Sequence, residues 1–388
     1  MNRIRTITLA AIVLLGGTAS AAEYRQLPAD TYMDKMKGGW LGQAIGVVYG
    51  GPTEFKAKYR IFEEEIRPWK PGRIVECLGQ DDLYVEMSFL EAIEKYGLDI
   101  TNEQAGEAFA ETEFPLWHAN NEGRENVRKG IMPPDSGNKK NNPHCDDIDF
   151  QIEADLFGLL NPGMPQSSNA ICDKFGRMVN YGDGLYGGLF VAAMYSHAFF
   201  ESDIGRVIRL GLKSIPVGST YSACIRDVIH WHKKNPDDWR ATWKLIEDRW
   251  GQHPSGRCSR VPEINIDAKL NGAYVVMGLL YGGGDIEKTL EVATRCGQDS
   301  DCNPANAMGI LATIRGMSGL PEKYTSGMPD MAGKPFRNVH YTFDSVVETT
   351  NKFAREQIVR AGGSIETVDG REVFLIPAQY PKAAKLER

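Results

Sequence analysis

The sequence lacks several features that would mark particular classes of protein. It has no run of Lys and Arg, and its net charge is −7, so we do not expect a nucleic-acid-binding surface. Its seven cysteines include no CxxC pair, which argues against a zinc site or a disulfide framework and favours mostly buried thiols, with room for one or two bridges. It also has no low-complexity linker and no fixed-period repeat, and beyond the N-terminus no apolar stretch approaches membrane length.

The N-terminal residues have the pattern of a signal peptide. A positive segment with Arg3 and Arg5 precedes an apolar stretch over 7–15, and Ala19-Ser20-Ala21 supplies small residues for cleavage. We therefore expect residues 1–21 to be removed. The mature chain is then expected to be periplasmic or secreted, with no membrane attachment.

Helical periodicity dominates the rest of the chain, and strand patterns are few. We expect an all-α fold, a compact single-domain bundle over residues 22–340, with an appendage over 341–388. The appendage should contain a helix and a hairpin with strands 364–368 and 372–376, which turns at Asp369-Gly370. A polar loop is expected over 124–143. Helices are predicted over residues 33–48, 82–96, 102–117, 149–160, 187–200, 204–214, 221–233, 238–250, 268–281, 285–296, 303–317 and 346–361.

A stripe of glycines runs along the first predicted helix. Gly38, Gly42 and Gly46, with Gly50 just beyond, are spaced four residues apart. Glycine lowers helix stability, so a stripe of it on one face predicts that another backbone packs closely there. The same spacing favours helix pairing in membranes, but charged residues in this segment exclude that interpretation.

One acidic signature occurs twice, as Gly79-Gln80-Asp81-Asp82 and as Gly297-Gln298-Asp299-Ser300-Asp301. Each copy lies where a loop passes into an apolar helical stretch, so helix capping is one interpretation of each. Crowded carboxylates raise one another's pKa unless a cation lies between them, and Mg²⁺, Mn²⁺ and Ca²⁺ prefer oxygen ligands. If the fold brings the copies together, their aspartates suit a site for two metal ions.

The sequence resembles the ADP-ribosylglycohydrolase family, which includes dinitrogenase reductase-activating glycohydrolase. The resemblance covers about residues 36–321 and rests on four blocks: residues 42–55 with Glu54, Gln80-Asp81-Asp82, the Gly-rich loop 182–188, and Asp299-Ser300-Asp301-Cys302.

The resemblance implies an all-α fold and two bound Mg²⁺ ions, with Mn²⁺ or Ca²⁺ as alternatives. Glu54 and Asp299 are the implied catalytic residues. The expected sugar contacts are Asp149, Asp183, Gly184 and Tyr186. The implied metal ligands are Glu54, Gln80, Asp81, Asp82, Asp299 and Asp301.

Four positions depart from the family pattern. Gln43 and Asp183 stand where the family has Asp and Asn, and Gln80 and Cys302 stand where it has Thr. A thiol is a poor ligand for a hard cation, so we expect Cys302 to pack rather than to bind metal.

The implied function is Mg²⁺-dependent hydrolysis of a glycosidic bond of an ADP-ribosyl or related ribofuranosyl group, on a small-molecule or glycan substrate. Two alternatives stay open. One is an exported glycoside hydrolase acting on non-nucleotide furanosides or other cis-diol sugars. The other is a catalytically silent module that binds ADP-ribose or a sugar.

Overall fold

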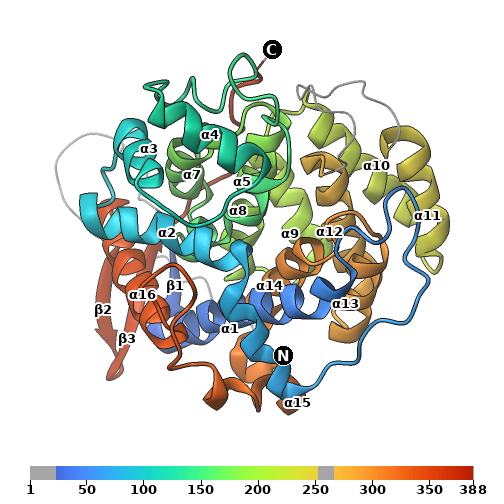
Figure 1. Ribbon diagram of the computed structural model, residues 1–388. Helices are drawn as coiled ribbons and strands as arrows, with labels where there is room; N and C mark the ends of the chain where they lie inside the picture. Colours follow the sequence, from blue (N-terminus) through green and yellow to red (C-terminus); the bar gives the residue numbers. More distant parts are fainter. Residues whose placement is uncertain (1–22, 252–265, 388) are drawn as a thin grey trace, which may run out of the picture.

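The computed structural model describes residues 23–251 and 266–387 as a helical bundle with one small sheet (Figure 1). The predicted fold class is therefore confirmed. The expected signal peptide lies outside the described residues. Among the helices of the described ranges, none has the length and apolar character needed to cross a membrane.

Four helices form the centre of the bundle: α1 (Ala29–Gly50), α8 (Asp183–Ala198), α12 (Ala268–Gly282) and α14 (Cys302–Arg315). Most of their residues are buried, on every side of each helix. Helices that are buried all round belong to the core of a large domain. α14 contacts each of the other three, so it is the middle element of this core.

The other helices surround this centre (Figure 1). They are α2 (Asp81–Tyr96), α3 (Asn102–Ala110), α4 (His118–Arg128), α5 (Asp149–Ile152), α6 (Asp155–Leu159), α7 (Pro165–Val179), α9 (Ile204–Gly211), α10 (Thr220–Lys234), α11 (Trp239–Ile246), α13 (Ile286–Arg295), α15 (Glu322–Thr325) and α16 (Phe343–Arg360).

The glycine stripe of α1 lies directly on α14. A Cβ atom on Gly38 would be 2.5 Å from the carbonyl oxygen of Ala312, and one on Gly50 would be 2.0 Å from that of Ser300. Because the partner number falls as the glycine number rises, the two helices run antiparallel. The predicted close backbone contact is confirmed.

The predicted hairpin belongs to a larger sheet. β2 (Ser364–Val368) and β3 (Arg371–Pro377) pair through a turn in which Asp369 and Gly370 both have positive φ, as a two-residue hairpin turn requires. β1 (Tyr24–Pro28) adds to the other side of β3, giving the order β1-β3-β2. Sequence patterning misses β1 because only Leu27 in it is buried.

Several predicted helix boundaries were wrong. The helix predicted over 149–160 is two short helices, α5 and α6, because the chain breaks at Glu153-Ala154. The helix predicted over 102–117 ends at Ala110. α4, most of whose residues are polar, and α7, which begins at Pro165, were not predicted at all.

The expectation of buried thiols is confirmed for the described residues. Cys258 lies outside them. The free, buried cysteines include Cys77, Cys172, Cys224, Cys296 and Cys302.

Candidate functional site

The α1–α14 contact holds two turns side by side. α1 leads into a 3₁₀ turn over Gly51–Thr53, and Glu54 follows that turn. The hydroxyl oxygens of Thr53 and Ser300 lie 2.7 Å apart, so this turn is hydrogen-bonded to the turn that precedes α14. Glu54 is thereby brought beside the second acidic signature.

The two acidic signatures open α2 and α14. Asp81 is the first residue of α2, and Asp301 is the N-cap of α14, where its carboxylate accepts a hydrogen bond from the backbone N–H of Cys302 at 3.0 Å. The capping interpretation thus holds for one oxygen of Asp301. Asp82 lies in the first turn of α2, where a negative charge favours the helix dipole, but neither it nor Asp299 caps a helix, and both are buried.

Potential ligand atoms gather in two groups that share Asp301. Glu54, Asp299 and Asp301 form one group, and Asp82, Asp301 and Cys302 form the other. Within each group the ligand atoms lie within 4.8 Å of one another. The other two residues implied as ligands are Gln80 and Asp81, and they belong to neither group. They line a cavity that Glu54, Asp299 and Asp301 also line.

The carboxylates of these groups are electrostatically coupled. Burial, followed by the charge of Asp301, raises the pKa of Asp82 and of Asp299 well above the usual value. The same causes raise the pKa of Asp81 to about 6. Burial and the charges of Asp301 and Asp81 raise the pKa of Glu54 to about 7. A cation among these oxygens would favour their ionised forms.

The donor chemistry fits a hard divalent cation. The Oδ1 atom of Asp82 is buried and has no hydrogen-bond partner in the described part of the chain, whereas most buried polar atoms have one, so this oxygen is available to a cation. Its Oδ2 atom lies 3.5 Å from Sγ of Cys302. Burial and the surrounding carboxylates raise the pKa of the Cys302 thiol far above its usual value, which keeps the sulfur protonated and a weak ligand.

The acidic groups open into a cavity of about 360 Å³. Asp149 and Glu153 also line it, and both are held by Asn120. The backbone N–H of Asn120 donates to Oδ1 of Asp149 at 3.0 Å, and its side-chain amide donates to Oε1 of Glu153. The second oxygen of each carboxyl is buried and has no partner among the described residues.

These two carboxyls hold protons more tightly than exposed ones. Burial and the charge of Asp147 raise the pKa of Asp149 to about 7. Burial and the charge of Asp149 raise the pKa of Glu153 well above its usual value. Sequence reasoning identified Asp149 and missed Glu153, which appeared to lie within a continuous helix.

Side chains from outside the motifs complete the cavity. Trp117, Phe55 and Arg337 line it, and the Trp117 side chain is 53% exposed. His118 lines it too, but burial lowers the pKa of this imidazole to about 4. Among the described lining residues Arg337 is therefore the one cationic side chain at neutral pH. No motif or periodicity in the sequence points to Arg337.

A third group of potential ligands adjoins the cavity through His118. The rings of His118 and His144 meet edge to face with centroids 5.4 Å apart, and Nδ1 of His144 lies 2.6 Å from Oδ2 of Asp147. These atoms form another group within 4.8 Å. The hydrogen bond to Asp147 raises the pKa of His144, so this ring is drawn toward its charged form.

Three residues expected to contact sugar do not line the cavity. Asp183 accepts a hydrogen bond from the backbone N–H of Tyr221 at 3.1 Å. The hydroxyl of Tyr186 donates to the carbonyl oxygen of Lys385 at 3.1 Å, and Gly184 packs closely against neighbouring groups. The polar atoms of Asp183 and Tyr186 thus bind other parts of the chain, and their proposed contact with substrate stays a prediction.

We compared the chain with known proteins, first by fold and then by sequence. A solved structure described as an ADP-ribosylglycohydrolase-related protein complex matches with a TM-score of 0.55 and 14% sequence identity, covering 84% of this chain and 99% of the other. The sequence profile of the ADP-ribosylglycohydrolase family matches residues 28–359. The chain therefore belongs to the ADP-ribosylglycohydrolase family, as its motifs predicted. A search among curated proteins found no match.

Proposed function

We propose that this protein is a divalent-metal-dependent glycohydrolase that cleaves a glycosidic bond of an ADP-ribosyl or related ribofuranosyl group. Family membership supports a hydrolase of this general type. One observation supports the metal dependence most strongly. Glu54, Asp82, Asp299 and Asp301 come from three distant segments and gather in two groups that share Asp301, beside a cavity.

The ligands of the proposed metal site are Glu54, Asp82, Asp299 and Asp301, with Asp81 and Gln80 at its edge. Two Mg²⁺ ions, when bound, would supply Lewis-acid polarisation of water and orientation of sugar hydroxyls. Glu54 and Asp299 are the proposed catalytic residues. Glu54 is the more exposed of the two, so its carboxylate can accept a proton from a water molecule in the cavity. The ring gains positive charge as the glycosidic bond breaks, and the surrounding carboxylates favour that charge.

Asp149 and Glu153 are suited to donate the proton that the leaving group needs. The pKa of Asp149 is raised to about 7 and that of Glu153 well above its usual value, so both hold a proton at higher pH than an exposed carboxyl does. Each also has an oxygen without a partner among the described residues. A general acid must retain its proton until the bond breaks, which is what burial provides here. Asn120 positions both groups through its two hydrogen bonds.

The charge of the cavity favours a second candidate, a glycoside hydrolase for non-nucleotide furanosides or other cis-diol sugars. An ADP group brings two phosphates, whereas Arg337 is the one cationic side chain among the described lining residues. Carboxylates dominate the rest of the polar lining. Bound metal ions would offset the carboxylates that hold them, but apart from Arg337 the described lining offers phosphates no cationic side chain, and a neutral sugar needs none.

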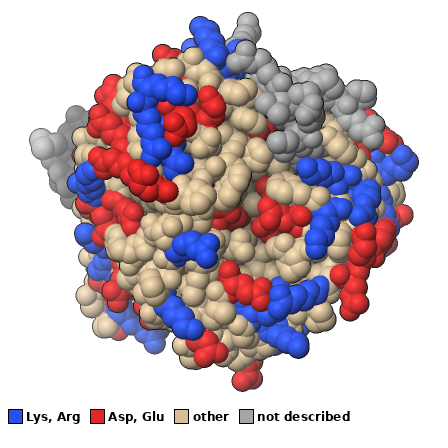
Figure 2. All heavy atoms as spheres, viewed as in Figure 1, with Lys and Arg blue, Asp and Glu red and all other residues tan. Residues whose placement is uncertain are grey.

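The proposed substrate is a small molecule or a glycan, met in the periplasm or outside the cell. The face of the molecule in Figure 2 mixes acidic and basic side chains and shows no continuous basic surface, which supports a partner other than nucleic acid.

A substrate panel tests the proposal. Purified mature protein with Mg²⁺ is assayed against ADP-ribosyl-arginine, ADP-ribosyl-serine, ADP-ribose and aryl furanosides. We expect turnover of at least one substrate, its loss in Asp299→Ala, and full retention in Asp237→Ala, which removes an exposed aspartate outside the site. Binding without turnover across the panel would instead favour the silent binding module.

A further inference from the structure

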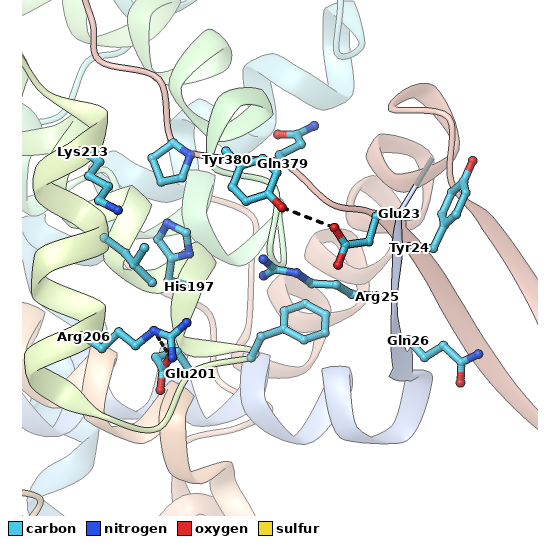
Figure 3. Close-up of a pocket in the computed structure, with 13 residues that line it drawn as sticks. Glu23, Tyr24, Arg25, Gln26, His197, Glu201, Arg206, Lys213, Gln379 and Tyr380 are labelled. Carbon is cyan, nitrogen blue, oxygen red and sulfur yellow. Dashed lines mark hydrogen bonds and ion pairs between the residues drawn. The ribbon is translucent and has the colours of Figure 1, made fainter. Parts of the chain in front are cut away.

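A second cavity, of about 590 Å³, lies where residues 23–26 approach residues 379–381 (Figure 3). Its walls come from β1, from the end of α8, from α9 and the turn that follows it, and from residues 379–381. None of its lining residues belongs to the acidic cavity. A site here would be separate from the proposed catalytic one.

The lining of this cavity has an excess of positive charge. Arg206 is paired with Glu201 at 2.8 Å, so their charges compensate. Arg25 and Lys213 also line the cavity, and within the described ranges neither forms an ion pair. Arg25 instead stands over the ring of Phe200, with its guanidinium carbon 5.4 Å from the ring centroid.

The remaining acidic side chain, Glu23, accepts a hydrogen bond from the hydroxyl of Tyr380 at 3.3 Å. Figure 3 shows this contact on the side of the cavity where β1 faces residues 379–381. Five ordinarily charged side chains thus line the cavity: Glu23, Arg25, Glu201, Arg206 and Lys213. Their formal sum is three positive and two negative charges, which leaves one positive charge.

His197 adds a buried polar atom without a partner. Only 3% of its surface is exposed, and its Nε2 atom has no hydrogen-bond partner in the described part of the chain. Figure 3 shows its ring between Lys213 and Arg206, with the Arg25 side chain extending toward it. Burial and these three cations lower the pKa of His197 to about 4, so the ring is neutral. A neutral imidazole nitrogen can donate to or accept from a ligand, and a buried one normally has a partner.

We propose that this cavity binds an anionic sugar, a ligand of monosaccharide size whose carboxylate or phosphate group lies among Arg25, Lys213 and His197. Charge-assisted hydrogen bonds from the two cations would hold the oxyanion. Tyr380 also lines the cavity and is 69% exposed, which leaves a face of its ring free to cover a sugar ring. The volume exceeds what a bare ion fills and suits a small organic ligand.

Calorimetry on the mature protein tests the site with four probes: glucuronate, glucose 6-phosphate, inorganic phosphate and neutral glucose. We expect one of the two charged sugars to bind more tightly than phosphate, and glucose not to bind. The tighter charged sugar shows whether carboxylate or phosphate is the natural group. The proposal is overturned if glucose binds as well as the charged sugars, or if inorganic phosphate equals both of them.

Two variants and a matched control locate the binding. Arg25→Gln and Lys213→Gln should each weaken binding by about tenfold, because each removes a charge-assisted contact. Lys234→Gln removes an exposed cation elsewhere and should change nothing. Melting temperature and hydrolase activity should be unchanged in all three, which separates this proposal from the catalytic one. Equal weakening in the control would contradict it.

The titration of His197 gives an independent readout. A bound anion beside the ring offsets the three cations, so the pKa of His197 should rise when the charged sugar is added. NMR of the ring protons across pH, with and without ligand, measures this change. An unchanged titration at saturating ligand would place the anion away from His197 and overturn the assignment.

Discussion

A Cβ atom on Gly46 would lie 2.2 Å from the carbonyl oxygen of Pro304, so α1 and α14 touch backbone to backbone two residues after α14 begins. The contact fixes the distance between the turn that carries Glu54 and the turn that carries Asp301. The glycine stripe therefore helps to build the acidic site. The glycines let α1 and α14 approach closely, and the acidic residues lie in the turns at one end of that contact.

Gly46→Ala should destabilise the protein by about 1–3 kcal/mol, the range found when atoms are added to a packed core. Gly51→Ala is the matched control, because the nearest atom to its added Cβ would be the amide nitrogen of Gln80 at 4.0 Å. Urea unfolding of both variants measures the difference. Equal stability of the two would show that the α1–α14 contact can relax.

Metal should stabilise the folded protein. Wild type treated with a chelator should gain about 2.7 kcal/mol when Mg²⁺ is added at one hundred times its dissociation constant. Asp301→Asn should lose this gain, because Asp301 belongs to both groups of ligands. Asn still caps a helix well, so the metal-free variant should be at least as stable as metal-free wild type. Scanning calorimetry with and without Mg²⁺ checks both expectations. A gain of equal size in Asp301→Asn would contradict the site.

The stability of the metal-free protein should fall as pH rises from about 4 to 8. The pKa of Asp149 is raised by burial to about 7, and that of Asp155 by burial to about 8. Folding therefore favours the protonated forms, and their contribution is full below the unfolded pKa and lost as pH rises through the folded one. The loss is on the order of a few kcal/mol.

Asp149→Asn tests this pH dependence. The amide oxygen of Asn can still accept the hydrogen bond from the backbone of Asn120, but it does not titrate. Thermal melting between pH 4 and 8 should show a shallower decline in the variant than in wild type. A slope as steep as that of wild type would mean that Asp149 does not hold its proton.

Gln80 and Cys302, which stand where the family has Thr, should alter the affinity for Mg²⁺. Both lie beside the carboxylates, and an amide and a thiol replace hydroxyls there. Restoring Thr at both positions should change Mg²⁺ affinity more than the free energy of unfolding, because the substitutions alter ligand atoms more than packing. Titration calorimetry and urea unfolding give the two quantities. A loss of stability with unchanged affinity would contradict this role.

The features that sequence could predict are those encoded locally. The glycine stripe and the Gly-Gln-Asp signatures can be recognised within short stretches of sequence. The close helix contact and the clustering of acidic residues could therefore be predicted. β1 could not, because its pairing depends on β3 nearly 350 residues later. Glu153 and Arg337 reach the cavity only through tertiary packing, and neither stands in a motif. For Asp183 and Tyr186, a motif match alone did not predict what the side chains contact. The family motif is present, but their polar atoms form hydrogen bonds with other parts of this chain.

Arg337 should decide how well the enzyme tolerates phosphate in its substrate. It is the one cationic side chain among the described residues that line the acidic cavity, so a phosphate-bearing ligand depends on it more than a neutral sugar does. Arg337→Gln should lower kcat/KM for an ADP-ribosyl substrate by about tenfold, the loss expected for one charge-assisted contact.

For an aryl furanoside, the same substitution should leave kcat/KM nearly unchanged, since no anion faces the lost charge. Lys334→Gln, three residues away and exposed, is the control and should affect neither substrate. Steady-state kinetics on both substrates with the three proteins gives the comparison. If Arg337→Gln lowered kcat/KM equally for both substrates, Arg337 would maintain the shape of the cavity instead of binding a phosphate. The charge of the cavity would then not discriminate between the two candidate substrates.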